Sequence, residues 1–170
     1  CFKGGSALLQ WPCTANGSQS IPSYKGYDYL SEVLASNGYV VVSISANGVN
    51  AVDNAVFDLG ALARAELIQK HLDILNGFNT TGGAPFGTKF VGKFDMTRIG
   101  TMGHSRGGEG MRAAYEQYRA PGSPWPLRIG TPIGFEALFE IGPVDGQTGP
   151  RTNPNRLVAD GLAWTVLLPN

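Results

Sequence analysis

Apolar runs and amphipathic stretches alternate along this chain, and their spacing predicts its secondary structure. The predicted strands are residues 39–45, 98–103, 132–141 and 163–168. The predicted helices are residues 27–34, 56–75 and 109–119. Because residues 39–45 are apolar almost throughout, we expect a strand that is buried on both faces, as in parallel sheets. The alternation predicts an α/β protein with a mostly parallel sheet flanked by helices.

Local signals add detail at three places along the chain. Asn37-Gly38 is expected to end the first helix in a left-handed conformation. Residues 46–54 are predicted as a polar loop, whose asparagines and aspartates could line a site or fill ordinary turn and cap roles. His71 lies on the apolar stripe of the helix over residues 56–75, so we interpret it as a packed, hydrogen-bonded residue and not as a catalytic base.

The strand over residues 132–141 carries an unusual pattern. One face is apolar, but the other carries Glu136 and Glu140, which does not suit a strand buried on both sides. The preceding helix has a buried stripe made of Met111, Ala114, Tyr115 and Tyr118. Arg112 and Glu116 are predicted to face water as an i, i+4 ion pair.

Composition narrows the class of protein. The chain has 170 residues, enough for one domain, and a net charge of +0, which gives no support to nucleic-acid binding. No apolar run reaches about 18 residues, so no membrane span is predicted. Cys1 and Cys13 are the only cysteines. They either form a disulfide, as in secreted proteins, or stay free thiols; a zinc site is excluded, and no metal or cofactor is expected.

The most informative stretch is Gly103-His104-Ser105-Arg106-Gly107, which matches the Gly-x-Ser-x-Gly pattern of a nucleophile elbow. It stands between a predicted strand and a predicted helix, where an elbow holds its serine in a strained conformation. A side chain at position 103 or 107 is expected to collide with the neighbouring strand or helix. The alternative is a glycine-rich turn whose serine only caps the helix.

Further stretches extend this pattern beyond the elbow. They are Trp11-Pro12-Cys13 and residues 21–30, 35–50, 64–69 and 100–110. Together they resemble a family of secreted bacterial α/β hydrolases, esterases or lipases related to chlorophyllase-like, cutinase-like and platelet-activating-factor-acetylhydrolase-like enzymes. The resemblance covers most of residues 1–145. It implies a single α/β-hydrolase domain over residues 1–170 that is incomplete at both ends.

By this resemblance Ser105 is the nucleophile, and the backbone N–H of Arg106 is one donor to the oxyanion. The second donor would belong to a strand that precedes this chain, and the usual acid and histidine would follow it. His104 leaves the turn in a different direction from Ser105, so it is not expected to act as the base. Asp145 is a candidate acid, since some hydrolases carry the acid after the strand that follows the elbow helix.

The implied function is a secreted serine hydrolase that cleaves a small-molecule carboxylic ester through an acyl-enzyme on Ser105. We expect the chain by itself to be nearly inactive, because its histidine lies elsewhere. We also expect unpaired sheet edges, where another chain could supply the missing strands. Two alternatives remain open: a non-catalytic binding protein on a hydrolase scaffold, and a thioesterase or peptidase with the same nucleophile.

Overall fold

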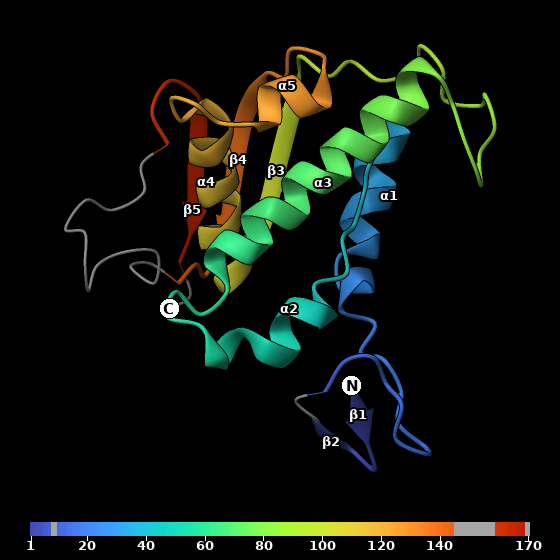
Figure 1. The fold of residues 1–170 in the computed structure, drawn as a ribbon, viewed down its shortest axis with the longest axis vertical. Coiled ribbons are helices and arrows are strands. Elements are labelled where there is room, and N and C mark those ends of the chain that lie inside the picture. Colours follow the sequence, from blue (N-terminus) through green and yellow to red (C-terminus); the bar gives the residue numbers. More distant parts are fainter. Residues whose placement is uncertain (8–9, 145–158, 169–170) are drawn as a thin grey trace. The chain divides into compact units, whose positions relative to one another are not determined.

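Three parallel strands form a sheet in the order β3-β4-β5 (Figure 1). The strands are β3 (Ile99–His104), β4 (Phe135–Ile141) and β5 (Ala163–Leu167). They coincide with three of the four predicted strands. The predicted mixed α/β content, with a parallel sheet flanked by helices, is therefore confirmed. The hydrolase type of this fold stays a prediction.

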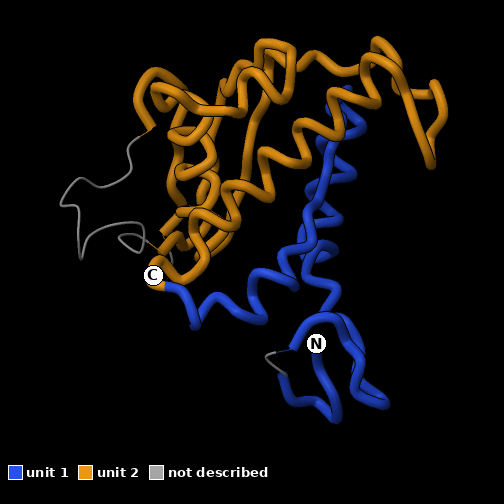
Figure 2. Tube along the Cα trace, in the orientation of Figure 1, with its two compact units in different colours: residues 1–56 blue, residues 57–170 orange. Residues whose placement is uncertain are grey.

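The structure, a computed structural model, describes residues 1–7, 10–144 and 159–168. The chain divides into two compact units, residues 1–56 and residues 57–170 (Figure 2). The parallel sheet belongs to the second unit. One hydrolase domain over the whole chain stays a prediction.

Two helices of the second unit pack in layers on the sheet. Helix α4 (Arg106–Arg119) lies against β3 and β4, and α3 (Ala61–Thr80) lies against α4 (Figure 1). The helices meet through small side chains, Ala65, Ala113 and Ala114, all fully buried. Leu138 of β4 and Met111 of α4 fill the space between helix and sheet. The predicted buried stripe of α4 is thus confirmed for Met111, Ala114 and Tyr115.

Helix α3 begins and ends about one turn later than the prediction of residues 56–75. The Asp58 carboxylate accepts hydrogen bonds from the backbone N–H groups of Gly60, at 3.1 Å, and Leu62, at 2.8 Å. Gly60 has a φ of 78°, so the chain turns there before the helix starts. The Asp58 carboxylate thus satisfies the N–H of Leu62 in the first turn, a contact at the helix start that the apolar spacing alone did not locate.

A short helix that the sequence did not predict, α5 (Trp125–Ile129), lies near the N-terminal ends of β3 and β4 (Figure 1). Its Trp125 and Ile129 form a buried cluster with Leu72 and Met96. Residues 121–126 contain three prolines and a glycine, a composition that also suits a turn. A proline in the first helical turn is compatible with either structure, and burial of Trp125 favours the helix.

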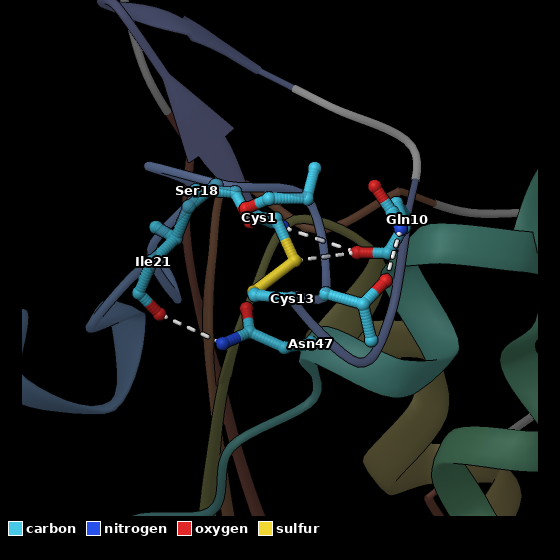
Figure 3. Close-up of a disulfide and its surroundings, with 8 residues drawn as sticks. Cys1, Gln10, Cys13, Ser18, Ile21 and Asn47 are labelled. Carbon is cyan, nitrogen blue, oxygen red and sulfur yellow. Dashed lines mark hydrogen bonds between the residues drawn. A yellow bond between two sulfur atoms is a disulfide. The ribbon is translucent and has the colours of Figure 1, made fainter.

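The first unit is built from short elements and contains a disulfide. The elements are β1 (Phe2–Lys3), β2 (Ser6–Ala7), η1 (Ser23–Lys25), α1 (Asp28–Ser36), α2 (Asn47–Val52) and η2 (Asp53–Ala55). Cys1 and Cys13 are bonded to each other (Figure 3), so the free-thiol alternative is wrong. The Asn47 amide of α2 donates to the carbonyl of Ile21 at 2.8 Å, which gives this side chain a structural partner (Figure 3).

Two predictions for the first unit fail and one holds. Residues 39–45 form no strand, and Tyr39 and Val40 are 65% and 58% exposed. An extended segment becomes a strand only when a neighbour pairs with its backbone, and no described segment does so here. The predicted loop over residues 46–54 is instead largely helical, as α2 and η2. The helix end at Gly38 is confirmed by its φ of 86°.

Asp95 closes the turn that leads into β3. Its carboxylate accepts hydrogen bonds from the Thr97 hydroxyl at 2.6 Å, the Thr97 N–H at 3.0 Å and the Arg98 guanidinium at 2.6 Å. The Thr97 hydroxyl bond, followed by the Arg98 bond, lowers the pKa of Asp95 from 3.8 to about 2. Because the folded pKa lies below the unfolded one, the turn gains stability above pH 3.8 and loses it as the pH falls towards 2.

This turn gives a prediction for acidic solutions. The carboxyl carbon of Asp95 should titrate in the folded protein with a midpoint near pH 2, measured by nuclear magnetic resonance. Thr97→Val removes the strongest donor and should move the midpoint towards 3.8. Ser123→Ala, whose hydroxyl accepts from Trp125 and not from a donor to Asp95, should leave the midpoint in place. A midpoint near 3.8 in the unaltered protein would contradict the hydrogen-bonded turn.

Candidate functional site

Ser105 forms the corner between β3 and α4 by itself. The strand ends at His104 and the helix begins at Arg106. Ser105 has φ 54° and ψ −124°, and Leu59 is the only other described non-glycine residue with a positive φ. A serine in such a conformation costs about 1–3 kcal/mol, so the surrounding structure must hold it there.

The chain that leaves β4 holds Ser105 by its backbone. The N–H of Ser105 donates to the carbonyl of Ile141 at 3.0 Å, and its own carbonyl accepts from the N–H of Val144 at 3.1 Å. The same carbonyl also accepts from the N–H of Gly108 at 3.0 Å, within the first turn of α4. Both peptide groups of Ser105 are therefore bonded, and the strained corner is fixed from two directions.

Close packing at the corner depends on Gly103. A Cβ atom at this position would lie 2.3 Å from the carbonyl oxygen of Gly107 and 2.7 Å from the nitrogen of Gly108. The expected collision at position 103 is confirmed, and its partner is the backbone of α4. The expected collision at Gly107 is wrong, because a Cβ atom there would meet nothing within 4 Å.

A buried ion pair lies beside this corner. Arg112 of α4 is 3% exposed and Glu140 of β4 is 1% exposed, and the guanidinium Nε donates to the carboxylate at 2.6 Å. The prediction that Arg112 faces water in a pair with Glu116 is therefore wrong, because Arg112 is buried and pairs with Glu140. Glu140 is paired with Gly103 in the strand register, on the sheet face that α4 covers. The other unexplained carboxylate, Glu136, is exposed.

Arg106 is the first residue of α4, where backbone N–H groups point out of the helix end and the helix dipole favours negative charge. This placement suits the predicted donation to an oxyanion formed at Ser105. The role of the Arg106 N–H stays a prediction. Ser105 itself is partly exposed at the end of β3.

The two histidines of the chain are not joined to Ser105. His104 is exposed, and none of the described side chains hydrogen-bonds to the Ser105 hydroxyl. His71 lies within α3, where its Nδ1 is 2.7 Å from the carbonyl of Leu67. The interpretation of His71 as a hydrogen-bonded helix residue is confirmed. Asp145, the candidate acid, lies outside the described residues.

Two cavities of the described structure lie away from the serine. One of about 470 Å³ is open and sits at the other end of β3, next to Asp95, Met96 and Thr97. A second, of about 290 Å³, lies beside Arg119 and Asp160. Within the described ranges, no group of three His, Cys, Asp or Glu side chains could hold a metal ion. In the same ranges, no helix has both the length and the apolar character needed to cross a bilayer.

Arg112 and Glu140 are the residues near Ser105 that sequence reasoning did not connect. A signal was present, since a carboxylate in a buried strand requires a partner. Gly108, Arg112 and Tyr115 lie along one side of a helix at i, i+4 and i+7, so Arg112 borders the stripe that faces the sheet. That geometry could have identified Arg112 as the partner.

No protein-family model, curated protein or solved structure matches this chain. The resemblance to α/β hydrolases therefore rests on the sequence motifs alone.

Proposed function

We propose that this chain belongs to a serine hydrolase that cleaves carboxylic esters, with Ser105 as the nucleophile. The observation that carries the proposal is the backbone conformation of Ser105. This non-glycine residue has a φ of 54° and is the single residue between a parallel strand and a helix. Strain of this kind persists only where the surrounding structure enforces it, and it clusters at functional sites. A serine that only capped the helix would not need it.

The proposed reaction has two steps. A general base takes the hydroxyl proton of Ser105 as the oxygen attacks the ester carbonyl carbon, and the same group returns that proton to the leaving alcohol, so that an acyl-enzyme remains. Water then releases the carboxylic acid and restores the serine. The Arg106 N–H would stabilise the oxyanion of both tetrahedral intermediates. The proposal assigns the base to neither His71 nor His104, because neither is hydrogen-bonded to Ser105.

A fluorophosphonate probe tests the proposal, because it phosphonylates activated serines. The protein should be expressed from its open reading frame, with any sequence that flanks these residues, and the labelled peptide identified by mass spectrometry. We expect one label, on Ser105, and none in Ser105→Ala. Ser123→Ala, a serine away from the corner, should label as the unaltered protein does. Absence of label on Ser105 would refute the proposed nucleophile.

The second candidate is a binding protein on a hydrolase scaffold. It is favoured by the lack of any described hydrogen bond to the Ser105 hydroxyl and by the two cavities, neither of which includes Ser105. The same experiment separates the candidates. A folded protein that the probe does not label at Ser105 supports binding without catalysis.

A further inference from the structure

The buried pair of Arg112 and Glu140 is expensive to form, because both charges are removed from water. Buried pairs of this kind often add little stability compared with apolar residues of similar size. Stability alone is therefore a weak reason for placing two charges under α4. The contacts of the pair suggest another role.

The Arg112 guanidinium bonds to both ends of one short segment. Its Nε donates to the Glu140 carboxylate at 2.6 Å, and its Nη2 donates to the carbonyl of Val144 at 3.3 Å. Residues 140–144 therefore form a loop whose two ends are fixed to the same side chain. A lysine could reach one of these acceptors as a point charge, but it lacks the planar fork of donors that reaches two.

The same segment holds Ser105. Between its fixed ends, Ile141 accepts from the Ser105 N–H and Val144 donates to the Ser105 carbonyl. A Cβ atom on Gly108 would lie 2.8 Å from the Cβ atom of Pro143, so the segment also packs against the first turn of α4. Each group that fixes the Ser105 backbone from the β4 side thus lies between the two attachment points of Arg112.

We propose that Arg112 and Glu140 are positioning residues, which hold residues 141–144 against the corner and so keep Ser105 in its strained conformation. They act through the backbone of that segment and need no contact with substrate. The consequence for catalysis rests on the proposed function of Ser105. The positioning itself does not, and it can be measured separately.

Hydrogen exchange of backbone amides measures the positioning directly. The variant Arg112→Met/Glu140→Leu removes both charges without leaving one unpaired, so it should fold. We expect the Ser105 and Val144 amides to exchange at least about tenfold faster than in the unaltered protein, because their local opening becomes easier. Amides inside α3 serve as the reference for global unfolding and should change by less than about threefold.

Two further variants sharpen this test. Arg112→Lys keeps the positive charge but reaches one acceptor, so it should give an intermediate acceleration at Val144. Arg98→Met removes the exposed pair with Asp95 and should leave the Ser105 amide unchanged. An equal acceleration in α3 and at Ser105, or an unchanged Ser105 amide in the double variant, would overturn the proposal.

Phosphonylation separates this inference from the proposed function. If Ser105 is the nucleophile, its labelling rate in the folded double variant should fall about 10- to 100-fold, with partial recovery in Arg112→Lys. If the unaltered protein is not labelled but the amides behave as expected, the proposed function fails and the positioning role stands. Labelling that is equally fast in all variants would show that the pair does not position Ser105 for reaction.

Discussion

Gly103→Ala should destabilise the second unit by about 3 kcal/mol or more, at or above the upper end for an overpacked site. The added Cβ would lie 2.3 Å from one backbone atom of Gly107, and backbone atoms cannot rotate away as a flexible side chain can. Either α4 moves away from β3 or the corner at Ser105 opens. Urea unfolding followed by circular dichroism would measure the loss, and phosphonylation of Ser105 should fall with it.

Gly107→Ala is the matched control for this variant. Its Cβ would meet nothing within 4 Å, and Gly107 lies in α4 with no positive φ. Alanine is the better helix former, so the free energy of unfolding should stay within about 1 kcal/mol of the unaltered protein. Equal unfolding midpoints for the two alanine variants would mean that strand and helix do not approach each other as closely as the structure has them.

Removing one partner of the buried pair should cost about 3–5 kcal/mol, because the remaining charge stays buried without compensation. We expect this for both Arg112→Met and Glu140→Leu. The double variant should recover most of the loss, since two apolar side chains of similar volume leave neither charge of the pair buried without its partner. Urea unfolding of the four proteins forms a double-mutant cycle that measures the coupling.

The exposed pair of Arg98 and Asp95 is the comparison for this cycle. Arg98→Met should change the free energy of unfolding by less than about 1 kcal/mol, because water screens exposed ion pairs. Two single variants at Arg112 and Glu140 whose losses simply add in the double variant would argue against the pairing.

The sequence by itself determined the elements whose signals are local. The apolar runs at residues 98–103, 132–141 and 163–168 became the parallel sheet, and the glycine pattern located the corner at Ser105. These predictions hold because hydrophobic periodicity and glycine conformation act within a few residues. The role of Ser105 as a nucleophile stays a proposal, since a backbone angle is not a reaction.

The tertiary structure decided which residues meet. The apolar pattern of residues 39–45 states a tendency to pair, but pairing requires a neighbouring strand, and the described structure provides none. The helical spacing predicted an exposed Arg112, but in the folded chain β4 lies beside α4 and its Glu140 pairs with this arginine. Both differences have the same physical reason. A buried charge and a strand are each stable only with a partner that is distant in sequence, and local spacing does not specify that partner.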